Sequence, residues 1–426
     1  MTEHISLPVQ ASQTGAARLK MRHAAERRFR IYGLAAVLFG LGCIATLFIT
    51  IVSGGYSTFT QTVMNIELDL DRELIDPKNI SETDFRKIVR TSIYELFPEV
   101  SGRRDKRKLA NIVSPGAEYQ LRDHVIANPD LIGTIITLQV PMSDDIDQLS
   151  KGVIRADLDE SERRVSDLEI TWFNALREQG RVETVFNTTF FSAGDSRDPE
   201  LAGILGAALG SFYTLLVTLL LSFPIGVASA IYLEEFAPKN RFTQIIEINI
   251  NNLAAVPSIV FGLLGLAVFL NFFGLPRSAP LVGGMVLALM TLPTIIIAGR
   301  AALKSVPPSI RQAAIGLGAS PMQTLMHHTL PLAMPGMLTG TIIGMAQALG
   351  ETAPLLMIGM VAFIVDIPAS VMDPATVMPV QIYLWSDSPE RAFVERTSGA
   401  ILVLLAFLIT MNALAVVLRK KFEQKW

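Results

Sequence analysis

Glu351 is the only charged residue in an apolar run that extends from Leu332 to about Val365. An ionised carboxylate at mid-membrane depth costs about 2.5–3.5 kcal/mol, so it persists only where it faces a protein interior or water. Two roles are open for it. The carboxylate lines a water-filled path, or it caps a helix that begins at Thr352 or Ala353 by accepting backbone N–H groups. We favour the first role.

A second stretch with informative spacing is KSVPPSIRQAAIGLGASPMQTLMHHTLPLAMPG, residues 304–336. Pro307 and Pro308 predict the start of a helix, where a missing N–H costs little. A single apolar stripe follows at helical spacing, and Gly318 is suited to end the helix in a left-handed conformation. The stripe consists of Ile310, Ala313, Ala314 and Leu317.

A second short helix is predicted directly after Gly318. Ser320 and Gln323 have the spacing of a capping box, and Pro321 suits the first helical position. We expect Pro331 to end this helix. The two amphipathic helices then need a cover for their apolar sides. The pattern alone leaves open whether that cover is a separate protein or the chain's own membrane spans.

Motifs for catalysis are missing from the sequence. It contains no Gly-x4-Gly-Lys-Ser/Thr phosphate loop, no His-Glu-x-x-His and no Gly-x-Ser-x-Gly. His327 and His328 are adjacent, so on a helix they point apart and make a poor metal pair. We therefore expect no enzyme, no metal site and no cofactor bound by this chain.

Long apolar runs must position these residues. Half of the 426 residues are hydrophobic, and a helix needs roughly 20 apolar residues to cross a bilayer. We predict an all-α polytopic membrane protein with six spans. The runs are 31–52, 201–233, 245–273, 280–298, 332–365 and 399–418. The fifth is longer than one span needs and is broken at Gly350, Glu351 and Pro354, so we expect a helix followed by an irregular or re-entrant piece.

Lys and Arg in the flanking segments predict the orientation. They gather before the first run, after the last one and in loops 234–244 and 299–331, whereas the alternate short loops hold few. Both termini are therefore expected in the cytoplasm. The first run is longer than the core of a signal peptide and is followed by the poor cleavage site SGGYST, so we expect a retained helix.

The segment 53–200 differs in character from the rest of the chain. It holds 45 of the 75 charged residues, and it mixes helical patterns with short β-like runs. We predict an inserted extracytoplasmic α/β or α+β domain. The resulting organisation is a basic tail at 1–30, a first helix at 31–52, the domain at 53–200, a core of five helices at 201–418 with a cytoplasmic loop at 300–331, and a tail at 419–426.

The stretch from Gln312 to Pro331 resembles the EAA loop of ABC importer permeases, with Ala313, Ala314, Gly318, Leu330 and Pro331 at matching positions. The family usually begins this motif with Glu, where this chain has Gln312. The run GETAPLL from Gly350 and the run NLAAVPSIVFGL from Asn252 are similar to the A-type permease of phosphate-specific transport systems, which has a MetI-like core. The likeness covers residues 201–426 well and the preceding domain poorly.

This resemblance implies several partners. The loop is expected to dock on a cytoplasmic dimer of ATP-binding subunits, which hold the ATP and Mg, through Arg311, Gln312, Ala313, Ala314, Gly318, Leu330 and Pro331. A C-type phosphate permease is expected to complete a heterodimer in the inner membrane, and an extracytoplasmic phosphate-binding protein delivers the anion. Membrane lipid surrounds the spans, and no nucleic acid is expected.

The resemblance also implies a translocation pathway at Glu351, Gln347, Thr352, Pro354 and Ser258. Relatives commonly carry Arg where this chain has Gln347, so either the partner subunit attracts the anion or the anion is another one, such as molybdate or sulfate. A membrane-anchored sensor that uses the outer domain is a further alternative. A secondary transporter would show two repeated halves, which this sequence lacks.

Overall fold

The computed structural model describes residues 9–72, 74–75 and 79–422. These residues form two units, one that ends at Gly54 and one that begins at Gly55. The predicted tails at 1–30 and 419–426 therefore fall partly outside the described residues, at 1–8 and 423–426.

The first unit is a single long helix, α1 (Val9–Gly55). It contains the first predicted run and is long and apolar enough to cross a membrane. Large apolar side chains such as Leu38, Phe39 and Leu47 are more than half exposed. A stretch of helix that is apolar on all sides is suited to lipid.

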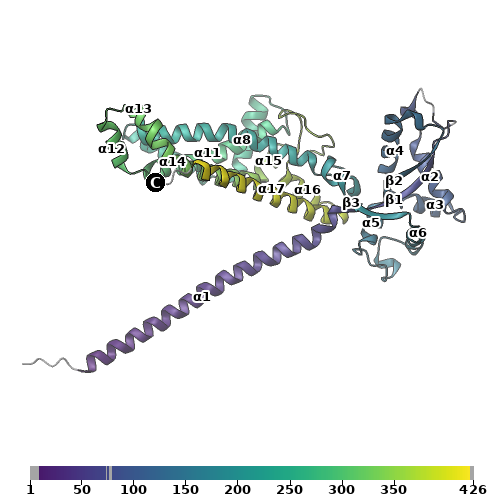
Figure 1. Ribbon diagram of the computed structural model, residues 1–426, viewed down its shortest axis with the longest axis horizontal. Coiled ribbons are helices and arrows are strands. Elements are labelled where there is room, and N and C mark those ends of the chain that lie inside the picture. Colours follow the sequence, from purple (N-terminus) through teal and green to yellow (C-terminus); the bar gives the residue numbers. More distant parts are fainter. Residues whose placement is uncertain (1–8, 73, 76–78, 423–426) are drawn as a thin grey trace, which may run out of the picture. The chain divides into compact units, whose positions relative to one another are not determined.

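The second unit contains a sheet module, residues 60–201, and a bundle of long helices (Figure 1). The module is built on three antiparallel strands in the order β2-β1-β3, with Ile66 opposite Leu138 and Thr62 opposite Thr184. The strands are β1 (Thr60–Asp69), β2 (Ile135–Pro141) and β3 (Val182–Phe186). Its helices are η2 (Ile80–Glu82), α2 (Phe85–Leu96), α3 (Arg103–Ala110), α4 (Gly116–Ala127), η3 (Pro129–Leu131), α5 (Asp144–Ser150), η4 (Glu160–Glu162), α6 (Asp167–Glu178), α7 (Thr188–Ser192) and η5 (Pro199–Leu201).

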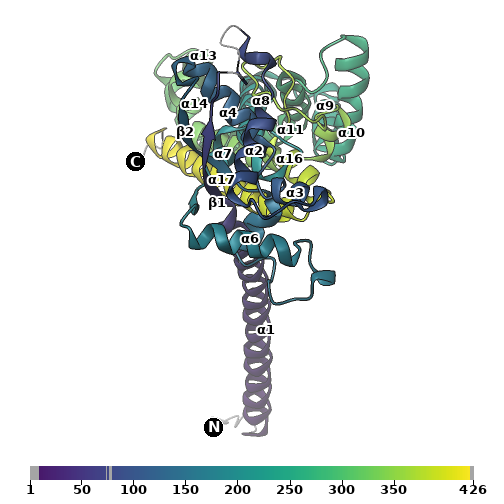
Figure 2. The ribbon, with the colours of Figure 1, turned by 90° about the vertical axis from the view of Figure 1, so that its right-hand side faces the viewer.

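The core of the sheet module follows from its sequence periodicity. Along β1, Ile66 and Leu68 are fully buried while Glu67 and Asp69 face solvent, the alternation of a half-buried strand. In α2, buried apolar side chains recur at helical spacing, and Asp84 caps the first turn by accepting from the backbone N–H of Lys87. Figure 2 views the unit from the side of this module.

The bundle comprises the remaining elements after η1 (Tyr56–Phe59) and the sheet module. They are α8 (Leu205–Ile231), η6 (Tyr232–Phe236), α9 (Arg241–Ala254), α10 (Ser258–Gly265), η7 (Leu266–Phe272), α11 (Pro280–Ser305), α12 (Pro308–Gly316), α13 (Pro321–Thr324), η8 (Leu325–Thr329), α14 (Leu330–Gly350), α15 (Ala353–Met357), α16 (Met378–Ser386) and α17 (Ala392–Phe422). Three of these, η6, η7 and η8, are π-helical turns. Helix α11 packs against both α8 and α14 and forms the middle of the bundle.

Candidate membrane spans account for most of the helical residues. By length and composition, five helices within the described residues are able to cross a membrane, or six if one bent pair counts as a span. That pair joins α9 to α10 and η7 through a bend of 101° just before Ser258. The prediction of a mostly helical protein with several apolar helices is confirmed.

The prediction that Pro331 ends a helix is wrong. The helix that begins at Pro321 continues through η8 into α14 and reaches Gly350, a length of 30 residues. Pro331 lies in the first turn of α14, and the preceding π turn widens the ring to bring the N–H of Leu330 to the carbonyl of Leu325. Proline has no N–H to donate, and at Pro331 the π turn has already shifted the hydrogen-bonding pattern, so the helix continues through it.

The fifth apolar run breaks where the sequence predicted. Helix α14 ends at Gly350, and the five-residue helix α15 begins at Ala353. Glu351 and Thr352 thus form a short connection between two helices inside an apolar segment. Irregular backbone at membrane depth is tolerated only where protein or a water-filled cavity surrounds it.

Candidate functional site

The loop between α11 and α14 has the local structure that its sequence dictates. Helix α12 begins at Pro308, and Gly318 beyond its end has a φ of 92°, which favours glycine. Ser320 and Gln323 form the predicted capping box: each side chain bonds the backbone N–H of the other residue, at 3.2 and 2.9 Å. Two tight helical starts therefore fix the shape of this loop.

The apolar side of the loop is divided between the chain's own core and the surface. Ala314 and Leu325 are buried, and Leu325 packs in one core with Leu303 and Met337 of the bundle. In contrast, Leu317 is 91% exposed, and Ile315, Met322 and Met326 are each at least half exposed. Packing within the chain therefore covers only part of the loop, and the remaining apolar patch is free to bind another protein.

The residues predicted to couple with an ATPase occupy different environments. Gln312 and Ala313 are exposed on α12, whereas Leu330 and Pro331 are half-buried at the start of α14. The Arg311 guanidinium points to the chain's own Glu235, at 2.8 Å. His327 and His328 are exposed, and the described residues contain no cluster suited to a metal ion.

Glu351 is half-buried at the break between α14 and α15. Its backbone N–H bonds the carbonyl of Ala348, but within the described residues its carboxylate has no hydrogen bond or ion pair. Thr352, not Glu351, occupies the cap position of α15, and its side chain forms no cap bond. The structure therefore does not show Glu351 capping this helix. Gln347, one turn earlier, is exposed. Within the described residues, the side chains of Gln347, on α14, and of Glu351, just after it, therefore make no hydrogen bond.

The remaining predicted pathway residues lie where two broken helices meet. Ser258 is the first residue of α10, directly after the bend, and Pro354 is buried in α15. The two helices come close at Gly262, where an added Cβ would lie 2.7 Å from the Pro354 Cα. Glycine at this position therefore lets the backbone of α15 rest on α10 and fixes the connection that carries Glu351.

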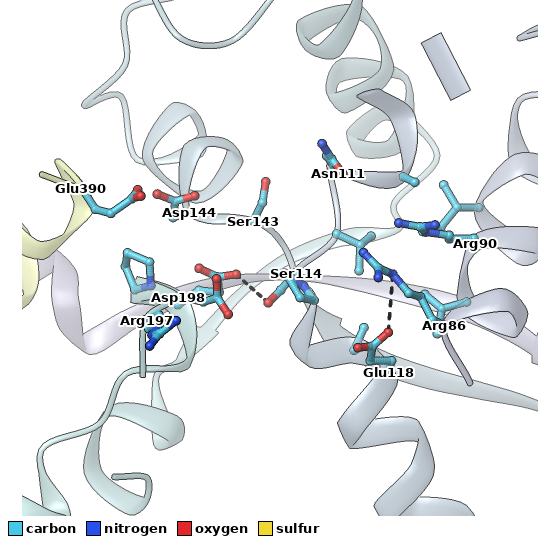
Figure 3. A pocket seen from close by; sticks show the side chains of 18 residues that line it. Arg86, Arg90, Asn111, Ser114, Glu118, Ser143, Asp144, Arg197, Asp198 and Glu390 are labelled. Atoms are coloured by element: carbon cyan, nitrogen blue, oxygen red, sulfur yellow. Dashed lines mark hydrogen bonds and ion pairs between the residues drawn. The ribbon is translucent and has the colours of Figure 1, made fainter. Parts of the chain in front are cut away.

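The sheet module has a cavity of about 350 Å³ that sequence reasoning missed (Figure 3). Arg86 and Arg90 of α2 line one side of it, and Asp144, Asp198 and Glu390 lie toward the other. Arg86 lies 3.7 Å from Glu118. The residues come from five separate segments, so no local motif in the sequence signals the cavity.

Two carboxyl groups in this cavity have raised pKa values. Burial raises the pKa of Glu200 to about 7, although a hydrogen bond from the Ser114 hydroxyl at 2.6 Å partly opposes the shift. Burial, and then the charge of Asp145, raises the pKa of Asp144 to about 6. Both groups therefore titrate near neutral pH, at the place where the sheet module joins the bundle.

Comparison with known proteins assigns the two parts of the chain differently. Residues 222–426 match the family described as binding-protein-dependent transport system inner membrane component, and residues 16–160 match a domain of unknown function (DUF3333). Phosphate transport system permease protein PstA 1 of Mycobacterium tuberculosis (strain ATCC 25618 / H37Rv) is 31% identical over 51% of this chain and 70% of its own length. The chain belongs to the binding-protein-dependent transport permeases.

Other relatives of this permease agree with that assignment. Phosphate transport system permease protein PstA of Haemophilus influenzae is 31% identical, over 50% of this chain and 74% of its own. Among solved structures, an inward-facing MetNI methionine ABC transporter matches 51% of this chain and 95% of its own with 18% identity and a TM-score of 0.42. The sequence likeness to these permeases confirms the resemblance to ABC importer permeases, so the chain is a membrane permease subunit and not an enzyme.

Proposed function

We propose that this permease subunit carries inorganic phosphate into the cytoplasm as part of an ATP-driven importer. The observation that supports the substrate most is the likeness of the bundle to PstA permeases, which extends over at least 70% of the length of those relatives. The loop at residues 300–331, with its uncovered apolar patch at Leu317, suits a permease driven by a separate ATPase.

The proposed arrangement in the inner membrane has six spans and both termini in the cytoplasm. The bent pair α9 and α10–η7 counts as one of the spans. Basic residues in the first half of α1, ahead of its apolar run, and in the loop that contains α12 support this orientation. It places the sheet module outside the cytoplasm, as the domain predicted at 53–200.

Three kinds of partner complete the proposed importer. A dimer of ATP-binding subunits binds the loop and holds the ATP and Mg; this chain holds no cofactor of its own. A C-type phosphate permease packs beside this one to form a heterodimer. A phosphate-binding protein delivers the anion from outside. Gln312, Ala313 and the neighbouring exposed apolar side chains are the proposed contact with the ATPase.

The proposed translocation pathway passes Ser258, Gln347, Glu351, Thr352 and Pro354. Glu351 is an anion, so it does not bind phosphate directly. Its carboxylate has no partner in the described residues, and we propose that it forms an ion pair with a Lys or Arg of the partner permease. Forming and breaking that pair then opens and closes the path, because an unpaired charge at this depth is costly.

A second anion is favoured by one specific residue. Gln347 offers a neutral amide in place of a charged, bidentate guanidinium, which weakens the attraction for phosphate from this side of the pathway. Molybdate or sulfate is therefore the alternative substrate.

Reconstitution distinguishes the two substrates. The permease pair, its ATPase and the binding protein are placed in liposomes, and uptake of labelled phosphate, sulfate and molybdate is measured with and without ATP. ATP-dependent phosphate uptake that requires the binding protein supports the proposal. Uptake of sulfate or molybdate in its place would assign the importer to that anion.

Replacement of the pathway acid tests its role separately. Glu351→Gln removes the charge but keeps the shape, so phosphate uptake should fall at least tenfold while the ATPase still copurifies with the permease. Thr339→Ser, on the same helix and far from the break, is the matched control and should transport normally. Normal uptake by Glu351→Gln would remove Glu351 from the pathway.

A further inference from the structure

Six charged side chains gather where η6, the turn that follows α8, meets α9, α11 and α12. We call them the charge cluster. Its acids are Glu234, Glu235 and Glu247, and its bases are Arg300, Lys304 and Arg311. The numbers of acids and bases are equal, and the residues come from four separate elements. The cluster therefore ties these elements together by charge.

Arg300 of α11 is the centre of one half of the cluster. Its guanidinium lies 2.7 Å from Glu247 of α9 and 3.4 Å from Glu234 of η6, and Lys304 adds a contact of 3.5 Å to Glu234. Helix α9 has no buried residue of its own. The pair with Arg300 is therefore the main polar tie between α9 and the middle of the bundle.

Arg311 of α12 is the centre of the other half. One guanidinium nitrogen lies 2.8 Å from Glu235 of η6 and also donates to the backbone carbonyl of Leu303 at the end of α11, at 2.8 Å. Arg311 thus contacts the ends of two spans at once. The only buried residue of α12 is Ala314, and Ile310 is partly buried against the core that contains Leu303. The charge contact therefore adds to a small apolar contact in holding α12 to the bundle.

The contact between Arg311 and Glu235 is close but poorly aligned. The buried atoms Glu235 Oε1 and Arg311 Nε both lack a well-directed hydrogen bond within the described residues. Glu235 also lies on a π-helical turn, a local widening that often occurs at functional positions. When α12 shifts, these two unbonded atoms can come into line and form a charge-assisted hydrogen bond. A contact that can tighten in this way suits a moving joint, whereas a rigid joint would already have the bond.

We propose that Arg311 and Glu235 form the joint through which α12 moves α8, and that Arg300 passes this movement to α9. The inference rests on the proposed function, since it assumes that an ATPase moves α12. Arg311 is then a positioning residue that acts on the spans of its own chain. The exposed residues next to it, Gln312 and Ala313, contact the ATPase in its place. Because the pair is partly buried, loss of one partner leaves the other charge uncompensated.

Charge reversal tests the joint in the reconstituted importer. Arg311→Glu and Glu235→Arg should each lower ATP-dependent uptake of labelled phosphate at least tenfold while the ATPase remains bound and continues to hydrolyse ATP. The double variant, which restores opposite charges, should recover uptake to within about threefold of the unmodified protein. Lys239→Glu, an exposed reversal in the loop before α9, is the control and should leave uptake unchanged.

The outcomes separate the joint from the proposed function. If the unmodified complex takes up no phosphate, the proposed substrate is wrong, and the ratio of ATP hydrolysis with and without the binding protein still reports on the joint. If Arg311→Glu releases the ATPase and a reversed acid on the ATPase restores binding, Arg311 contacts the partner and the joint is refuted. The same conclusion follows if the double variant is folded, binds the ATPase and is no more active than the single variants.

Discussion

Lys151 Nζ lies 2.9 Å from the carboxylate of Glu395, a residue 244 positions later in the chain. The same ammonium lies 2.7 Å from Asp147 in α5. All three side chains are nearly inaccessible to solvent, with exposed fractions of 8%, 6% and 12% for Lys151, Asp147 and Glu395. The Thr58 hydroxyl also donates to the backbone carbonyl of Glu395. The sheet module is thus fastened to the first turn of α17 by one buried cation shared between two acids.

Removal of this cation is expected to be costly. Lys151→Met leaves Asp147 and Glu395 buried without their shared ammonium partner, which should destabilise the protein by about 3–5 kcal/mol. The measurement is the thermal unfolding temperature of the purified protein in detergent.

A triple replacement provides the control for Lys151. Lys151→Met combined with Asp147→Asn and Glu395→Gln removes all three charges together, so it should recover most of the lost stability. Equal stability of Lys151→Met and the unmodified protein would mean that the buried pair does not fasten the module.

The stability of the protein should depend on pH through Glu200. Its pKa is raised from 4.5 to about 7, so the folded chain holds this proton more tightly than the unfolded chain does. The contribution of Glu200 to the free energy of unfolding is therefore fully present below pH 4.5. It is lost as the pH rises toward 7, a decrease on the order of 3 kcal/mol. Asp144, with a pKa raised to about 6, acts in the same direction.

Glu200→Gln isolates this contribution. The amide still accepts a hydrogen bond from Ser114 but has no proton to lose, so the variant should unfold at a higher temperature than the unmodified protein at pH 8 and at a similar one at pH 5. Asp157→Asn is a control at an exposed acid outside the cavity. A pH profile that is the same for Glu200→Gln and the unmodified protein would refute the assignment.

The contact between α10 and α15 should tolerate no additional side-chain atom at Gly262. In Gly262→Ala the new Cβ would lie 2.7 Å from the Cα of Pro354 and 2.8 Å from its carbonyl oxygen, both backbone atoms. The helices must separate, at a cost of about 1–3 kcal/mol. We expect a lower unfolding temperature and reduced phosphate uptake. Gly40→Ala, where the new Cβ meets nothing within 4 Å, should have no such effect.

The exposed apolar patch of the loop should be needed for binding the ATPase. Leu317 is 91% exposed, so Leu317→Asp should change the stability of the isolated permease by no more than about 0.5 kcal/mol. The aspartate would nevertheless place a charge in an apolar contact, so copurification of the ATPase should fall at least tenfold. Leu317→Met keeps the patch apolar and should bind normally. Unchanged binding by Leu317→Asp would exclude the patch as the docking surface.

Features set by a few neighbouring residues were predictable from the sequence. The left-handed Gly318, the capping box of Ser320 and Gln323, and the break after Gly350 each depend on local backbone chemistry. The effect of Pro331 was not predictable in the same way. Proline usually ends a helix, but a π turn of five residues before it changed the hydrogen bonding, and nothing in the local sequence marks that turn.

Contacts between segments that are distant in the sequence could not be predicted from local patterns. The resemblance implied that Arg311 contacts the ATPase, yet its guanidinium lies against Glu235 of its own chain, 76 positions earlier. Likewise, the hydrogen bond between Ser114 and Glu200 could not be predicted, because the two residues are far apart in the sequence and belong to no periodic pattern. Only the fold brings such residues together.

The uninterrupted helix from Pro321 to Gly350 has a consequence for the transmission of force. At 1.5 Å per residue, its 30 residues extend over about 45 Å, from the capping box to the residue before Glu351. Two helices with a hinge at Pro331 would absorb a small tilt at one end by bending between them. One continuous helix instead carries a rotation at its base along its whole length to its tip, next to Glu351.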